Sequence, residues 1–236
     1  MTYPAVALSW LNVVRLAILL MTALLGWITY RSHLLLKEFQ PSFNLLLSLP
    51  ENLVRLALVG LFLFLAWLSG LPSTALGLYS QTPWQMIVAG LVVGLVTVGV
   101  INLLTHWAIK RFGRQIYSPK LIHNILPQRP AEWILIALAF LPAVAMEELL
   151  FRTLWLGCFR PIIPLWLLIL FTSAVFGLMH QPQGLLGMIL AGTINVVFAI
   201  LFVWSGQLLL PLTAHYTTDV CQLLLAHYQR DWLESY

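Results

Sequence analysis

The sequence predicts an all-α protein, a polytopic bundle of transmembrane helices with a polar site inside the membrane, in the C-terminal half of the chain. Three observations lead to this fold class. Of the 236 residues, 61% are hydrophobic and 8% are charged. The mean hydropathy is +0.91, far above the range of a soluble domain. The hydrophobic residues form long runs, and the charged and histidine residues inside those runs cluster after residue 140.

Seven apolar stretches are long enough to cross a membrane core, which requires about 20 helical residues. They cover residues 5–30, 52–71, 84–108, 131–157, 162–179, 185–204 and 207–227. The segment SFNLLLSLP (42–50) is too short to span and ends at a proline. We expect it to form an interfacial or re-entrant helix, which could count as half of an eighth element.

Basic residues concentrate in two connections between the predicted spans. The connection 109–130 carries Lys110, Arg111, Arg114, Lys120 and Arg129, and the connection 31–51 carries Arg31 and Lys37. The two connections are separated by two spans, so both lie on the same side of the membrane. The positive-inside rule places that side in the cytoplasm, with the N-terminus outside and the C-terminus inside. Because the positive charges lie in these connections and form no face, the net charge of +4 does not indicate nucleic-acid binding.

The chain divides into three parts on this basis. Residues 1–130 hold N-terminal spans and the basic loop, residues 131–228 form a core with the features of a catalytic unit, and residues 229–236 form a tail. No cleavable signal peptide is expected, because the first positive charge, Arg15, already lies inside the first apolar stretch.

The polar residues within the later spans are the candidate functional residues. A charge at the centre of a bilayer costs about 2.5–3.5 kcal/mol on insertion scales, so such residues face the interior of a bundle and mark function by default. Glu148 and Arg152 are four residues apart on one helical face and are expected to pair. Glu147 points about 100° away from Glu148, which leaves its carboxylate free for another role.

Two further pairs show the same helical spacing. His215 and Asp219 lie one turn apart, so the carboxylate can hold the imidazole in one tautomer. Phe176 lies one turn before His180 and could shield the site from water. We expect the coordinates to bring His180 within about 7 Å of the Glu147 carboxylate, a separation that one water molecule bridges.

The motifs EELLFR, FGLMH and HYTTD, in this order and on separate spans, resemble the EExxxR, FxxxH and HxxxN/D series of the CPBP family of glutamic intramembrane proteases. That family includes the type II CAAX prenyl endopeptidases and their bacteriocin-processing and Abi relatives. The resemblance covers residues 130–225. It implies hydrolysis of a peptide bond within the membrane, without a covalent intermediate.

The resemblance also implies a role for each motif residue. Glu147 corresponds to the general base, and His180 to its partner in activating water. His215 and Asp219 occupy the positions that line the oxyanion site. The supporting residues are Glu148, Arg152 and Phe176.

Several alternatives stay open from the sequence. Zinc bound by glutamate and histidine is chemically possible but not favoured, because the EE pair lacks the compact ligand spacing of a zinc helix, so we expect no cofactor. A non-proteolytic scaffold or immunity-type protein would share the fold, and a proton-coupled transporter would also place such residues in mid-membrane. The expected partners are the lipid bilayer and a membrane-embedded or lipid-anchored peptide or protein substrate. The expected location is a bacterial plasma membrane or another internal membrane.

Overall fold

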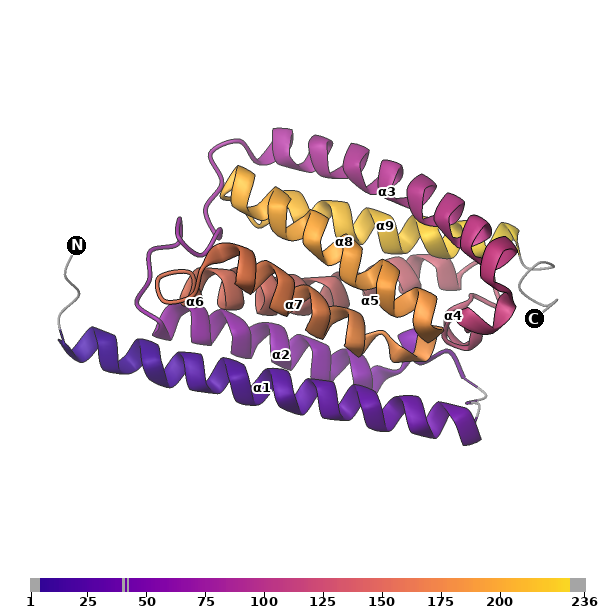
Figure 1. Cartoon of the computed structure of the whole chain (residues 1–236), viewed down its shortest axis with the longest axis horizontal. Coiled ribbons are helices and arrows are strands. Elements are labelled where there is room, and N and C mark those ends of the chain that lie inside the picture. The colour runs from indigo at the N-terminus through magenta and orange to yellow at the C-terminus, as the bar shows by residue number, and fades with distance from the viewer. Residues whose placement is uncertain (1–4, 40, 42, 230–236) are drawn as a thin grey trace.

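The computed structural model describes residues 5–39, 41 and 43–229, and this part of the chain is helical, without strands. Figure 1 shows long helices lying side by side and running back and forth along the long axis of the molecule. The long helices are α1 (Ala5–Glu38), α2 (Leu49–Leu68), α3 (Pro83–Phe112), α5 (Glu132–Glu148), α7 (Leu165–Met179), α8 (Gly184–Ser205) and α9 (Leu209–Tyr228). The short elements are η1 (Leu45–Leu47), η2 (Arg114–Ile116), α4 (Lys120–Ile125), the π-helical η3 (Leu149–Leu156), α6 (Gly157–Phe159) and η4 (Gln181–Gln183).

Each of the seven predicted spans corresponds to one of these helices, so the predicted fold class is confirmed. Within the described residues, five segments are long and apolar enough to cross a membrane: Trp10–Glu38, Leu49–Leu68, Pro83–Phe112, Glu132–Phe159 and Gln181–Ser205. Helix α7 is apolar but has only 15 residues. Helix α9 has 20 residues, but its polar side chains, among them His215 and Asp219, lower its hydropathy. Helix α7 is thus short and ends at the predicted site residue His180, and helix α9 is less hydropathic because it contains predicted site residues.

The structure corrects two boundaries that the sequence predicted. Helix α1 continues to Glu38, so Arg31 and Lys37 lie on a helix and not in a loop. The described part of the segment 42–50 forms no eighth span, because its helical residues are those of the short η1 and the start of α2. The Asn44 side chain caps η1 by accepting from the backbone of Leu46, and it donates to the Ile125 carbonyl at 2.9 Å. The segment thus packs against the end of α4, which explains why it does not penetrate further. The predicted tail, 229–236, lies outside the described residues except for its first residue.

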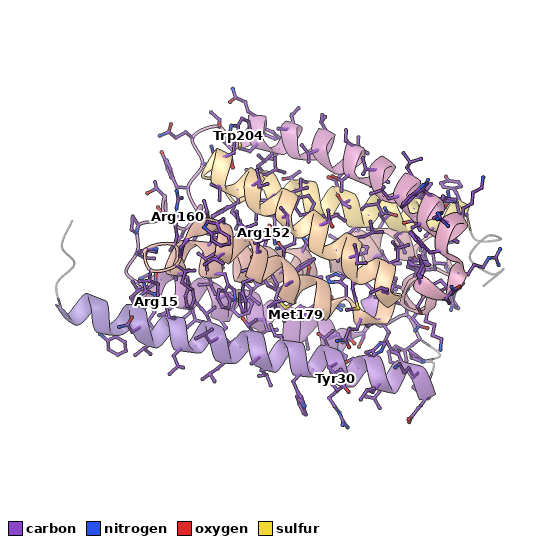
Figure 2. The ribbon with its side chains drawn as sticks, in the orientation of Figure 1. Arg15, Tyr30, Arg152, Arg160, Met179 and Trp204 are labelled. Carbon is purple, nitrogen blue, oxygen red and sulfur yellow. The ribbon has the colours of Figure 1, made fainter. Side chains whose placement is uncertain are left out.

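The basic residues of the two predicted connections lie at one end of the bundle. Helices α1, α3 and α9 all end there, and α4 lies there as well, at the right of Figure 1. The expectation that the two basic segments share one side is therefore met. The outer surface along the bundle is apolar, with Trp204 77% and Tyr30 47% exposed (Figure 2). An apolar outer surface of this kind faces lipid in a membrane protein.

Helix α1 is tied to the bundle by two buried polar contacts as well as by apolar packing. Arg15 donates to the Cys158 carbonyl at 2.9 Å. The Trp155 indole donates to the Thr22 hydroxyl, also at 2.9 Å. The Arg15 side chain therefore has hydrogen-bond partners of its own. It is a structural residue that joins α1 to α6 and does not take part in the polar site.

Helices α3 and α9 approach each other through glycines. A Cβ atom added at Gly90 would lie 2.6 Å from Cβ of Thr213, and one added at Gly94 would lie 2.6 Å from Cβ of Thr217. Only a residue without a side chain fits at such a distance. Because His215 lies between Thr213 and Thr217 in the chain, the glycines of α3 fix the depth at which α9 holds this histidine.

We expect Gly94→Ala to destabilise the protein by about 1–3 kcal/mol, because the new methyl group meets Thr217 and also the Ala214 carbonyl oxygen at 2.7 Å. Gly99→Ala on the same helix is the matched control, because nothing lies within 4 Å of a Cβ there. Thermal unfolding of the purified proteins in detergent measures both. Equal melting temperatures for the two variants would show that α3 and α9 are not packed this closely.

Candidate functional site

The buried ion pair predicted between Glu148 and Arg152 is confirmed. Arg152 Nε lies 3.1 Å from Glu148 Oε2, and both side chains are 0% exposed. The π-helical η3 starts directly after Glu148, and all of its residues are buried. Such π-helical turns are rare and occur frequently at functional sites.

Two aromatic rings complete the surroundings of Arg152. Its guanidinium carbon lies 5.9 Å from the ring centre of Phe176 and 5.8 Å from that of Phe198, which are distances of cation–π contact. The three guanidinium nitrogens form no hydrogen bond with well-aligned geometry among the described residues. Arg152 is therefore held by the charge of Glu148 and by the two rings, in the interior of the bundle (Figure 2).

His215 joins the carboxylates of α5 to α9. Its Nδ1 lies 2.8 Å from Glu148 Oε1, a short hydrogen bond to a carboxylate that Arg152 also contacts. Its Nε2 lies 3.6 Å from Asp219 Oδ2, too far for a strong hydrogen bond. The expected pair of His215 and Asp219 is therefore present as a longer ion pair, and the hydrogen bond of the ring goes to Glu148, which the sequence did not indicate. The spacing within α9 could not show this, because Glu148 is 67 residues away in the sequence.

Glu147 is the more accessible of the two adjacent glutamates. Its side chain is 31% exposed, whereas that of Glu148 is 0% exposed. Glu147 Oε2 lies 3.7 Å from His215 Nε2, on the opposite edge of the imidazole from Glu148. The two glutamates therefore face different surroundings, as their 100° angular separation on the helix predicts.

His180 terminates α7 and is oriented by the helix itself. Its Nδ1 lies 2.8 Å from the Phe176 carbonyl oxygen, and its ring lies 4.5 Å from the Phe176 ring. A carbonyl oxygen only accepts, so Nδ1 carries the hydrogen and Nε2 is left available to another group. Among the described residues, no ion pair of 4.0 Å or less joins His180 to Glu147. The water-bridged separation expected between these two side chains stays a prediction.

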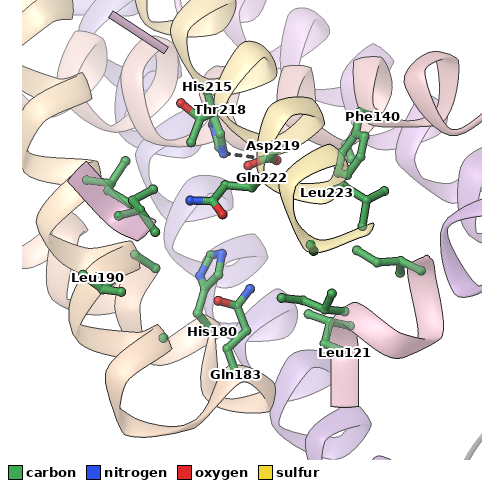
Figure 3. A pocket seen from close by; sticks show the side chains of 18 of the residues that line it. Leu121, Phe140, His180, Gln183, Leu190, His215, Thr218, Asp219, Gln222 and Leu223 are labelled. Atoms are coloured by element: carbon green, nitrogen blue, oxygen red, sulfur yellow. Dashed lines mark ion pairs between the residues drawn. The ribbon is translucent and has the colours of Figure 1, made fainter. Parts of the chain in front are cut away.

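These side chains face one cavity of about 350 Å³ (Figure 3). Glu147, His180, His215 and Asp219 all line it, together with Phe176. The cavity also reaches residues of η1, of α4 and of the C-terminal end of α9, which lie at the basic end of the bundle. The predicted site residues from α5, α7 and α9 are thus brought to a single cavity that extends toward that end.

Two residues at the site were not identified from the sequence. Phe198 contacts both Arg152 and His215, but a phenylalanine in an apolar span has no distinguishing signal. Gln222 lines the cavity seven residues after His215, so the helical spacing along α9 could have indicated it. A further buried contact, from Asn195 to the Ser173 hydroxyl at 2.9 Å, fixes α8 against α7 behind the site.

The arrangement of ligand-type side chains bears on metal binding. Within the described residues, no three histidine, cysteine, aspartate or glutamate side chains converge in a way that could hold a metal ion. The nearest approach to such a set is His215 Nε2 with Glu147 and Asp219 at 3.7 and 3.6 Å, which resembles an ion-pair cluster.

Carboxylates and histidines meet in a cavity within a bundle of apolar helices, an arrangement typical of an integral membrane protein with a buried polar site. Residues 129–221 match the family model described as type II CAAX prenyl endopeptidase Rce1-like. The chain is also 30% identical over 142 residues to the uncharacterized protein YpbD of Bacillus subtilis, covering 58% of this chain and 70% of that protein. No solved structure matches the chain significantly.

The chain therefore belongs to the Rce1-like family, a family of CAAX-type intramembrane proteases. The matched residues contain all three motifs that the sequence identified, from Glu147 to Asp219. The family assignment made from those motifs is confirmed.

The contrast between the two glutamates leads to a prediction about stability. Glu148→Gln and Arg152→Ala each leave a buried charge without its partner, and we expect a loss of about 3–5 kcal/mol. Glu147→Gln should leave the melting temperature nearly unchanged, because that side chain is partly exposed and makes no hydrogen bond of 3.5 Å or less among the described residues. Thermal melts in detergent measure all three.

Glu51→Gln serves as a control for loss of an exposed pair. Glu51 and Arg55 are 2.9 Å apart but 44% and 22% exposed, so this substitution should cost about 1 kcal/mol or less. If Glu147→Gln unfolds the protein as readily as Glu148→Gln, the division between a supporting and a free glutamate is wrong.

Proposed function

We propose that this protein is an endopeptidase that hydrolyses a peptide bond of a membrane-associated substrate, with Glu147 as general base and without a metal ion. The observation that carries the proposal is the unequal treatment of two adjacent carboxylates. Glu148 is bound by Arg152 and His215 and is fully buried, whereas Glu147 is partly exposed to the cavity. A general base must reach its water molecule, and only Glu147 of the two can do so.

The proposed reaction begins with a water molecule held between Glu147 and His180 Nε2. Glu147 accepts a proton from this water, and the oxygen of the water bonds to the carbonyl carbon of the substrate. The π electrons of the carbonyl move to its oxygen and form a tetrahedral oxyanion. The carbonyl then reforms as the C–N bond breaks, and the leaving nitrogen keeps the electron pair and takes the proton from Glu147. The products are a carboxylic acid and an amine, and Glu147 is regenerated.

His215 is proposed to stabilise the oxyanion. Its Nδ1 hydrogen is directed at Glu148, so only Nε2 faces the cavity side with Glu147 and Asp219. Because Nδ1 already carries a hydrogen, a hydrogen on Nε2 requires the charged imidazolium form of His215, which the three neighbouring carboxylates favour. The imidazolium donates this hydrogen to the developing negative charge, and preorganised donors of this kind supply much of the rate enhancement of such sites. Asp219 supports this role by lying 3.6 Å from the same nitrogen, where it favours a hydrogen there.

The direction of the cavity supports a location and a route for the substrate. It reaches the end of the bundle where the basic residues gather, the end that the positive-inside rule assigns to the cytoplasm. We propose that the protein lies in a bacterial plasma membrane with this end facing the cytoplasm, and that the substrate peptide enters from there. A membrane-embedded or lipid-anchored peptide would present its cleavage site at this depth.

The proposal predicts that Glu147→Gln abolishes turnover while the fold is kept, because the amide cannot take a proton from water. Quantitative proteomics of membranes from cells that express either form identifies peptides that are cut only by the wild type. A reporter peptide built on such a site then gives kcat/KM, which should fall by about 10²–10⁴ in the variant. Identical cleavage in both strains would rule out Glu147 as the base.

Metal removal provides an independent prediction. We expect kcat/KM on the same reporter to be unchanged after dialysis against EDTA and 1,10-phenanthroline. The reason is that no step of the proposed reaction requires a metal ion as a Lewis acid. Loss of activity that added zinc restores would contradict the metal-independent mechanism and favour a metal bound by Glu147, His215 and Asp219.

A further inference from the structure

Gln222 lies on the same face of α9 as the two polar residues of the HYTTD motif. It follows Asp219 by three residues and His215 by seven, so the three side chains form a row along the helix. All three line the cavity. Figure 3 shows the Gln222 amide directed into the cavity, drawn between the ring of His180 and the carboxylate of Asp219.

The amide nitrogen of Gln222 is buried and unused in the folded protein. It is inaccessible to solvent and has no hydrogen-bond partner among the described residues. A buried N–H group without a partner destabilises a fold, so native proteins seldom keep one. Because the Gln222 side chain lines the cavity, a ligand that enters the cavity can bring the missing acceptor.

Two other potential donors at the cavity, Thr218 and Arg55, already have partners. The Thr218 hydroxyl lies 2.7 Å from the Ala214 carbonyl oxygen, to which it donates. Arg55 is paired with Glu51 at 2.9 Å. Asp219 carries no hydrogen to donate when it is ionised. Gln222 therefore offers an uncommitted N–H donor next to the proposed reacting groups.

We propose that the Gln222 amide donates a hydrogen bond to the carbonyl oxygen of the scissile peptide bond and to the oxyanion that forms from it. This inference rests on the proposed function and adds a second donor beside His215. It also accounts for the aspartate at position 219. An asparagine there could donate directly, whereas in this chain the amide is supplied one helical turn later, by Gln222.

The test compares Gln222→Leu and Gln222→Glu with the matched control Gln85→Leu. Gln85 lies near the start of α3, is exposed and does not line the cavity. Loss of one oxyanion donor lowers kcat by about 100-fold with little change in KM, and we expect this for both Gln222 variants. The glutamate variant matters because it keeps the size of the side chain while removing the donor. The control should keep kcat within about twofold of the wild type, since it removes no hydrogen bond to the oxyanion.

Thermal melts separate a catalytic role from a structural one. The comparison of melting temperatures uses Gln222→Leu, because a glutamate at this position would bury a second carboxylate beside Asp219 and destabilise the fold. Because Gln222 Nε2 has no partner among the described residues, its removal breaks no hydrogen bond, and the melting temperature of Gln222→Leu should equal or exceed that of the wild type. A melting temperature lowered in parallel with kcat would show that Gln222 only supports the fold, and would overturn the proposal.

A double-mutant comparison gives the sharpest test. In an Asp219→Asn background the new amide can donate to the oxyanion, so Gln222→Leu should cost less than about tenfold in kcat there, against about 100-fold in the wild type. An equal loss in both backgrounds, or wild-type kcat for Gln222→Leu, would show that Gln222 does not contact the oxyanion. Glu147→Gln distinguishes the two proposals: if it is inactive while Gln222→Leu is fully active, only the present inference fails, and if both are fully active, the proposed function fails as well.

Discussion

The buried carboxylate of Glu148 is the group on which the rest of this site depends. It accepts from His215 at 2.8 Å on one side and faces Arg152 at 3.1 Å on the other. A carboxylate buried without such partners is very costly, so these two contacts must form together with the fold. Because Glu148 lies on α5, Arg152 on η3 and His215 on α9, the same contacts place these three elements relative to one another. The neighbouring Glu147 then has a defined position, 3.7 Å from His215 Nε2, and stays partly exposed.

Close helix packing supports this polar centre from outside. The glycines of α3 allow α9 to approach without a side chain between them, and the contact from Asn195 to Ser173 holds α8 against α7. In a bilayer, apolar burial does not drive helices together, so close contact between backbones and buried hydrogen bonds must supply the specificity. The small and polar residues of the outer helices are thus explained by the need to hold His215 and Phe176 in place.

In the proposed mechanism the site separates two tasks that a single ionisable group could not perform. One carboxylate is neutralised and orients a histidine, and the other is accessible and is proposed to accept a proton. Different surroundings for two neighbouring carboxylates are a recurring way to assign different roles to them. In this protein the surroundings differ because one helical residue step turns Glu147 toward the cavity and Glu148 toward Arg152. The membership of the chain in the Rce1-like family agrees with this arrangement at the level of reaction class.

The sequence alone determined the fold class, the approximate positions of seven helices and the pair formed by Glu148 and Arg152. These features depend on local periodicity, and an i, i+4 pair is settled by the geometry of one helix. The tertiary structure decided which partner each histidine has. The sequence assigned His215 to Asp219 because they share a turn, whereas the 2.8 Å hydrogen bond goes to Glu148 on another helix. Contacts between helices depend on their depth and rotation, which the spacing within a single helix does not contain. For the same reason the contacts of Phe198 with Arg152 and His215, and the unpaired amide of Gln222, became visible only when the helices were packed together.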